Sequence, residues 1–129
     1  MKGPTYHKPL TGMGKPKRTE YNGRVYPSKA QAARAADLDL LMAARQVLWW
    51  LPEVPIMIGD PKVDKPYRVD FLVCERVGLN HHVHAEDVKG FITPTFRRHV
   101  RQWRVSGPFP LHVLRGGELD IIPGGAQRD

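Results

Sequence analysis

The sequence predicts a mixed α/β fold in which helices cover a small mixed β-sheet. An Ala- and Leu-rich stretch at 28–47 is typical of a helix. Two strand-like segments, 67–75 and 81–88, are separated by a short turn and predict a β-hairpin. A further helix-like segment, 93–104, precedes two more short strands, so helices and strands alternate. The chain of 129 residues is long enough for one domain to bury a modest core without disulfides.

We expect the folded domain to occupy residues 21–123. Residues 1–20 are rich in Gly, Pro, Lys and Thr without a hydrophobic period, which is typical of a flexible basic arm. Residues 124–129 are predicted to be a polar tail. At the start of the domain, Asn22-Gly23 is a turn signal between two short extended pieces.

In the first helix, Ser28 is the expected N-cap, and Gln31 three residues later completes a capping-box pattern. The apolar residues that recur at helical spacing are Ala33, Ala36, Leu40, Ala43, Ala44 and Val47. The next segment, 48–58, reads LWWLPEVPIMI. Its Pro52 and Pro55 predict an edge strand or a broken strand.

The second helix is predicted by Thr93 as N-cap and Pro94 at the first helical position, and it should run to about residue 104. The residues expected on its buried face are Phe96, Val100 and Trp103. The residues that repeat this spacing on the neighbouring, basic face are Arg97, Arg101 and Arg104. Two final strands, 110–114 and 118–122, flank the Gly116-Gly117 turn.

Positive charge is concentrated in two blocks of the chain. Residues 1–24 carry six Lys or Arg against one acid, and residues 89–104 carry five with no acid, within a net charge of +7. Such blocks favour a polyanionic partner, with nucleic acid ahead of an acidic membrane surface and a plain solvated surface as the alternative. The candidate DNA contacts are Lys15, Lys17, Arg18, Arg24, Arg97, Arg98, Arg101 and Arg104.

Cellular context follows from the single cysteine and from the hydropathy pattern. Cys74 lies in an apolar run, is expected to be buried and cannot form an intrachain disulfide, which suits a reducing compartment. No apolar stretch approaches the length of a membrane span, and the N-terminus lacks the apolar centre of a secretory signal. We therefore expect a cytoplasmic protein with no membrane partner.

The segment 84–90, HAEDVKG, places three charged residues at the end of a strand. If the hairpin turns between Gly78 and Leu79, Asp70 lies opposite Asp87. Like charges in facing positions destabilise a sheet unless something positive intervenes, and Mg²⁺ is commonly held by one or two carboxylates. A longer loop centred on Gly78 would instead pair Asp70 with Glu86. An unrelated surface patch is the remaining interpretation.

Because side chains alternate along a strand, Lys89 should share the face of Asp87. Beside a metal it could orient or activate the attacking water, or stabilise charge on a phosphate in the transition state.

Three short motifs, in this order, carry a family resemblance. PSKAQA at 27–32 opens the first helix, VDF at 69–71 contains Asp70, and EDVKG at 86–90 contains Asp87 and Lys89. Together they resemble the PD-(D/E)xK nuclease superfamily. More narrowly, they are similar to small phage proteins grouped with archaeal-type Holliday junction resolvases. The resemblance spans roughly residues 19–115.

The resemblance implies a restriction-endonuclease-like core that hydrolyses phosphodiester bonds with Mg²⁺, or with Mn²⁺ in its place. It implies that Asp70 and Asp87 are metal ligands with the backbone carbonyl of Val88, and that Lys89 is catalytic. Related sequences tend to have Glu where this chain has Gln31. Gln31 could hold a water at the metal site through its carbonyl oxygen, or it could only cap the helix.

The implied function is cleavage of four-way DNA junctions by a homodimer, in the host cytoplasm if the protein is phage-encoded. The alternatives are another nuclease on the same core that acts on duplex DNA, and a DNA-binding module whose active site has decayed. The Gln31 departure motivates the second alternative.

Two other candidate sites have weaker support. The histidines near Cys74 suggest zinc, but they lack the usual ligand spacing and alternate between faces. These histidines are His81, His82 and His84. Trp49 and Trp50 could stack on unpaired bases, although core packing or a dimer contact is expected for at least one of them.

Overall fold

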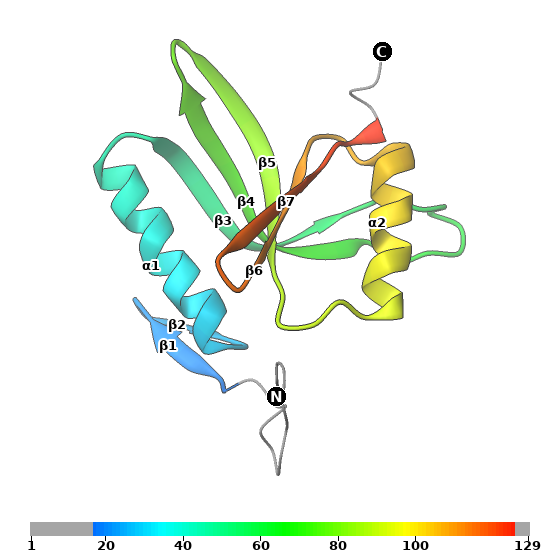
Figure 1. The fold of residues 1–129 in the computed structure, drawn as a ribbon, viewed down its shortest axis with the longest axis horizontal. Helices are drawn as coiled ribbons and strands as arrows, with labels where there is room; N and C mark the ends of the chain where they lie inside the picture. Colours follow the sequence, from blue (N-terminus) through cyan, green and yellow to red (C-terminus); the bar gives the residue numbers. More distant parts are fainter. Residues whose placement is uncertain (1–16, 126–129) are drawn as a thin grey trace. The chain divides into compact units, whose positions relative to one another are not determined.

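The computed structural model describes residues 17–125 and shows a mixed α/β protein with two helices, a five-stranded mixed sheet and a small hairpin (Figure 1). By its contacts the chain divides into an N-terminal unit, Met1–Asp39, and a C-terminal unit, Leu40–Asp129. The predicted fold class is confirmed at this level. Within the described part, no helix is long and apolar enough to cross a membrane.

The N-terminal unit contains a tight hairpin of β1 (Thr19–Tyr21) and β2 (Arg24–Tyr26). Asn22 and Gly23 both have positive φ, 51° and 83°, as a two-residue type I′ turn requires. The predicted turn is confirmed. β1 takes in the last two residues of the segment that was predicted as the arm, and most of that arm lies outside the described residues.

α1 (Lys29–Ala43) begins as the capping pattern predicts. The Gln31 backbone N–H donates to Ser28 Oγ at 3.1 Å, and the Ser28 hydroxyl donates to Gln31 Oε1 at 3.3 Å. The helix is shorter than predicted, because Val47 already belongs to the following strand, and Leu40 of the apolar pattern is 69% exposed. The buried residues of the helix are Gln31, Ala32, Ala35 and Leu38. Apolar residues lie on several sides of this Ala-rich helix, so spacing alone does not select one face.

The C-terminal unit is built on one sheet with the strand order β3-β4-β5-β6-β7. Its strands are β3 (Val47–Ile56), β4 (Tyr67–Val77), β5 (Asn80–Val88), β6 (Leu111–Arg115) and β7 (Glu118–Ile122). Neighbouring strands are antiparallel except β5 and β6, which are parallel and are connected through α2 (Pro94–Ser106). A helical crossover is the usual connection between parallel strands.

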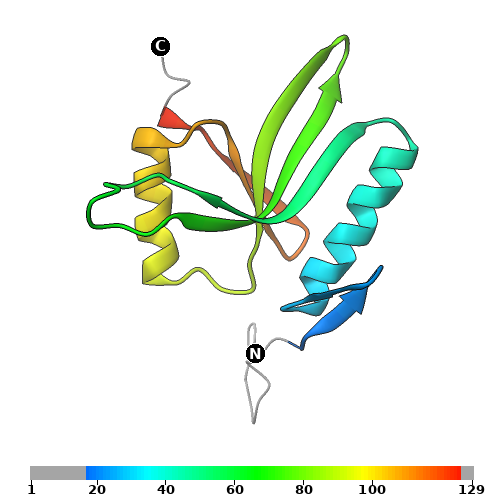
Figure 2. The ribbon, with the colours of Figure 1, turned by 180° about the vertical axis from the view of Figure 1, so that it is seen from behind.

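β3 is an edge strand, as its prolines predict. Figures 1 and 2 show that β3 and β4 bend together near their middle. Glu53 of β3 has a φ of 51°, in the left-handed region that non-glycine residues rarely adopt.

The β4–β5 hairpin has the two-residue turn that the sequence suggests. Val77 pairs with Asn80 and Phe71 with Glu86, so the turn consists of Gly78 and Leu79 alone. Gly78 has a φ of 63°, as the first position of a type II′ turn requires. The longer loop, which would pair Asp70 with Glu86, is excluded because Glu86 faces Phe71.

α2 has the two faces that its sequence predicts. Thr93 Oγ1 accepts the Phe96 backbone N–H at 3.0 Å, which confirms the N-cap. The helix buries Phe96 and Trp103 in the core of this unit, while its arginines are exposed. The other core residues are Ile58, Tyr67, Val69, Ala85, Leu111, Val113 and Ile122.

The chain returns to the end of α2 after β7. Gly124 and Gly125, which were predicted as tail, lie against this helix end. A Cβ on Gly125 would approach the Val105 carbonyl oxygen to 1.9 Å, so only glycine fits there. Residues 126–129 of the predicted tail lie outside the described residues.

Candidate active site

Asp70 and Asp87 meet where the β4–β5 ladder ends. Phe71 and Glu86 are the last paired residues, which places Asp70 opposite Asp87, as the two-residue turn predicts. Asp87 Oδ1 accepts the Asp70 backbone N–H at 3.0 Å, and Asp70 Oδ2 accepts the Val88 backbone N–H at 2.8 Å. Each carboxylate therefore bonds to the backbone of the other strand.

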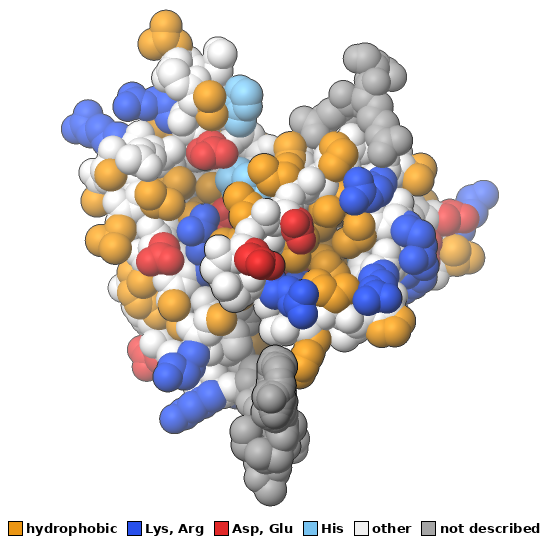
Figure 3. Space-filling view, viewed as in Figure 1, with side chains coloured by type: hydrophobic (Ala, Val, Ile, Leu, Met, Phe, Trp, Pro, Cys, Tyr) orange, Lys and Arg blue, Asp and Glu red, His pale blue; other side chains and the backbone are white. Residues whose placement is uncertain are grey.

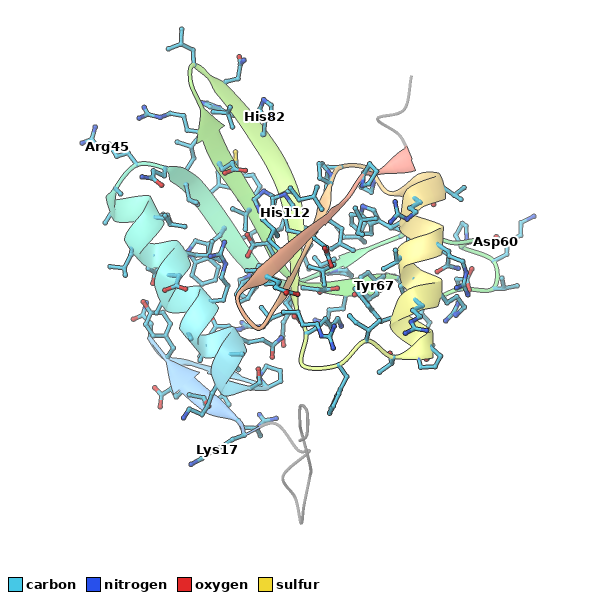
Figure 4. The ribbon with its side chains drawn as sticks, in the orientation of Figure 1. Lys17, Arg45, Asp60, Tyr67, His82 and His112 are labelled. Atoms are coloured by element: carbon cyan, nitrogen blue, oxygen red, sulfur yellow. The ribbon has the colours of Figure 1, made fainter. Side chains whose placement is uncertain are left out.

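Asp87 is buried, with 1% of its surface exposed. The Tyr67 hydroxyl donates a hydrogen bond to Asp87 Oδ2. Burial raises the pKa of Asp87 to about 6, although the charge of Lys89 and the hydrogen bond from the Asp70 backbone act in the opposite direction. Tyr67, labelled in Figure 4, is held by a ring contact with His99 at 4.3 Å between centroids.

Lys89 lies on the same side of the sheet as Asp87, as the alternation of side chains predicts. Its Nζ is 4.4 Å from the centre of the Phe96 ring, and Phe96 belongs to the core that α2 forms over Ala85. The Lys89 backbone N–H donates to the Leu114 carbonyl at 2.9 Å, which fixes the backbone position from which the Lys89 side chain extends. Its charge also lowers the pKa of Asp87, so the two groups interact electrostatically.

The donor atoms at this site fit a hard divalent cation. The carboxylates of Asp70 and Asp87 offer only oxygen, the ligand that Mg²⁺ prefers. A carboxylate has about four lone-pair positions, so each can keep its observed hydrogen bonds and still bind an ion. The raised pKa of Asp87 marks a buried carboxyl whose negative charge is not fully compensated. The role of the Val88 carbonyl stays a prediction.

The remaining predicted catalytic residue, Gln31, belongs to the N-terminal unit. Its backbone N–H is capped by Ser28 Oγ and its side chain accepts from the Ser28 hydroxyl, and a contribution to the metal site stays a prediction. Lys17, Arg18 and Arg24 of the same unit are exposed, with the Arg24 guanidinium 5.9 Å from the centre of the Tyr26 ring. Lys15 lies outside the described residues.

The arginines of α2 form an exposed basic face, defined by Arg97, Arg98, Arg101 and Arg104. Figure 3 shows Lys and Arg side chains gathered over this helix. Acids from other elements lie near it, which the helix sequence alone does not reveal. Arg98 is 4.0 Å from Asp64, and Asp120 of β7 lines a cavity of about 340 Å³ together with Arg97 and Arg101.

Three residues near the site were missed by the sequence analysis. Tyr67 binds Asp87, and His99 packs on Tyr67. Glu53 lies opposite Asp70 on β3, because its neighbours Pro52 and Val54 pair with residues on either side of Asp70. An acid within the apolar run 48–58 was the available signal for Glu53, whereas Tyr67 resembles any aromatic residue at the start of a strand.

The two weaker candidates can also be placed. Cys74 is buried and pairs with Val83, so it faces away from His84, the next residue along β5. Among the described residues Cys74 belongs to no cluster of three ligand-type side chains, so the weakly supported zinc site of Cys74 with the histidines is not formed. Trp50 makes an edge contact with Phe71 at 5.7 Å between centroids, which confirms packing for one tryptophan, and Trp49 is 39% exposed.

In comparisons with known proteins, no family model, curated protein or solved structure matches this chain. Assignment of a function therefore depends on the geometry of the site and on the motifs in its sequence.

Proposed function

We propose that the protein is a Mg²⁺-dependent endonuclease with a PD-(D/E)xK site on a restriction-endonuclease-like core, and that it cleaves four-way DNA junctions. The observation that carries this proposal is the pairing of Asp70 and Asp87 at the point where two strands part, with the Lys89 amine on the same face. These three residues are the ones that the motif requires.

Asp70, Asp87 and the carbonyl of Val88 would hold Mg²⁺, and Mn²⁺ would substitute for it. The ion supplies Lewis-acid polarisation of a phosphoryl oxygen. The Tyr67 hydroxyl and the Asp70 backbone fix the orientation of the Asp87 carboxylate. Lys89 has a mobile ammonium group that can orient the attacking water or stabilise the charge that develops on the phosphate.

The exposed arginines of α2 suit contact with phosphates, which positions DNA without reading its sequence. Resolving a junction requires paired cuts in two strands, whereas one chain offers a single site. We therefore expect a two-fold homodimer, which presents two copies of Asp70, Asp87 and Lys89.

A DNA-binding module without catalysis is the second candidate, and the burial of Asp87 favours it. Both oxygens of this carboxylate already accept hydrogen bonds, and 1% of its surface is exposed. In such a module the two aspartates would only terminate the β4–β5 ladder.

The decisive experiment is cleavage of a labelled four-way junction and of a linear duplex with the same sequences, with and without Mg²⁺. We expect Mg²⁺-dependent, symmetric cuts in the junction in preference to the duplex. Asp70→Asn and Lys89→Ala should each lower the rate by roughly 10²-fold or more, since each removes an interaction made mainly in the transition state. DNA binding should be largely unchanged.

Glu118→Gln and Lys62→Ala are matched controls, because each makes a similar change at an exposed position outside the site. Both should retain full cleavage. Binding without cleavage by the wild-type protein would favour the non-catalytic module. Equal cutting of junction and duplex would favour a general nuclease.

A further inference from the structure

A second cluster of ligand-type side chains lies on the other side of β5. The ligand atoms of His84, Glu86 and His112 are all within 4.8 Å of one another. The cluster arises from the parallel pairing of β5 with β6, which places His112 opposite Glu86, while His84 precedes Glu86 by two residues and shares its face. Asp87 and Lys89 point to the opposite face.

The bonds within this cluster are incomplete. His84 and Glu86 are buried, and His84 Nε2 is 2.8 Å from Glu86 Oε2. The other ring nitrogen, Nδ1, is buried and forms no hydrogen bond with any of the described residues, although Glu75 Oε1 is 3.5 Å away. A buried polar atom without a hydrogen bond carries a desolvation cost, which a closer approach of the Glu75 carboxylate would remove.

The cluster also has an opening through which an ion could enter. A cavity of about 530 Å³ is lined by His84, His112 and Glu75, and by His82 at its exposed rim. Figure 4 labels His82 on β5 and His112 on β6, and Figure 3 shows histidine and acidic side chains together on this face.

We propose that His84, Glu86 and His112 bind a transition-metal ion of the Zn²⁺ type, in a site separate from that of Asp70 and Asp87. Two imidazoles and one carboxylate are a donor set found in zinc sites, whereas Mg²⁺ and Ca²⁺ prefer oxygen ligands alone.

Glu75 fits the role of an outer carboxylate in this site. Metal-binding histidines usually donate their second ring N–H to a carboxylate or carbonyl, which fixes the orientation of the ring. His84 Nε2 faces Glu86, so Nδ1 is the second nitrogen, and it is the one that lies 3.5 Å from Glu75. The approach of Glu75 would satisfy this nitrogen.

Binding requires a small rearrangement of one ring. Donors at about 2.1 Å from a tetrahedral ion are roughly 3.4 Å from each other, so His84 Nε2 and Glu86 Oε2, now 2.8 Å apart, must separate slightly while the His112 nitrogen turns toward the same ion. The His84 and His112 rings are stacked, 3.7 Å apart and inclined by 13°. His112 is half-buried at the cavity, so its ring can turn toward Glu86 while His84 stays in place.

The test is metal titration of the full-length protein after treatment with a chelator. Co²⁺ should bind with one equivalent per chain and give visible d–d absorption bands, and Zn²⁺ should displace it. Millimolar Mg²⁺ should not abolish the signal. His112→Gln and Glu86→Gln should each weaken binding by more than the roughly 10–100-fold typical of losing an outer partner, and Glu75→Gln should fall within that range.

Two variants separate this site from others. Asp70→Asn/Asp87→Asn should keep the Co²⁺ spectrum, because it changes only the opposite face of the sheet. His99→Gln should also keep it, because His99 is a histidine outside the cluster. If His112→Gln, folded as judged by circular dichroism, binds Co²⁺ as tightly as the wild type, the proposal is wrong. Loss of the signal in the double aspartate variant alone would assign the ion to the proposed nuclease site instead.

Discussion

At the scale of single residues, Asp87 has an unfavourable position for its charge. Its pKa of about 6 lies above the ordinary value of 3.8 because burial penalises the carboxylate more than Lys89 and the Asp70 backbone favour it. The folded protein therefore binds this proton more tightly than the unfolded chain. Protonation of Asp87 therefore stabilises the folded protein. This stabilisation is present below about pH 4 and is lost as the pH rises to about 6.

We predict that Asp87→Asn gains stability relative to the wild type as the pH rises. A pKa difference of about two corresponds to about 3 kcal/mol, so the difference in unfolding free energy should change by about this amount between pH 4 and pH 7. Urea unfolding across this range measures it. The comparison cancels the titration of other carboxyl groups, and a difference independent of pH would contradict the prediction.

Mg²⁺ should also shift the protonation equilibrium of Asp87. A cation beside Asp87 favours the carboxylate form, so added Mg²⁺ should raise the melting temperature of the wild type more at pH 7 than at pH 5. Asp70→Asn/Asp87→Asn should lose this response. Equal shifts in both proteins would mean that Mg²⁺ binds elsewhere.

At the scale of elements, α2 supports the site because Phe96 lies beneath the Lys89 amine. Its first turn depends on the Thr93 cap. We predict that Thr93→Ala lowers the unfolding free energy by about 1 kcal/mol, whereas Thr93→Ser, which keeps the hydroxyl, has a much smaller effect. Equal stability of the Ala and Ser variants in urea would show that the cap contributes little.

The register of the β4–β5 hairpin could be predicted from the sequence because a two-residue turn leaves no freedom in the pairing. Gly78 supplies the positive φ of the turn, and the position of Asp70 opposite Asp87 follows. The buried face of α1 could not be predicted in this way. With alanine on several sides, its exposed Leu40 fits a helical pattern as well as the buried Leu38 does.

Long-range pairing explains what the sequence did not reveal about the sites. His112 meets Glu86 through the parallel register of β5 and β6, which α2 connects, and no local pattern encodes it. Tyr67 reaches Asp87 beyond the last residue pair of the β4–β5 ladder, where the hairpin register no longer places side chains. Hairpin partners are thus readable from the sequence, whereas partners across a helical crossover are not.

At the scale of the whole molecule, the basic face of α2 should control the salt dependence of DNA binding. Each phosphate contact contributes about 0.9 to the slope of log K against log salt on duplex DNA. We predict that Arg101→Gln/Arg104→Gln reduces this slope by up to about 1.8.

Arg45→Gln/Arg76→Gln removes the same charge from exposed positions outside α2 and serves as the matched control. Fluorescence anisotropy at several salt concentrations would measure both slopes. Equal reductions in the two variants would show that net charge, and not this face, determines binding.

The turn at the tip of the β4–β5 hairpin makes the protein suitable for site-specific labelling. Leu79 is fully exposed, and the only native cysteine, Cys74, is 4% exposed. A Leu79→Cys variant would carry a single reactive thiol. At about 3.3 Å per residue, a fluorophore there would be roughly 25 Å along β4 from Asp70. This separation is within the working range of energy transfer, so one dye on the tip and another on a DNA arm would report docking while the site stays unmodified.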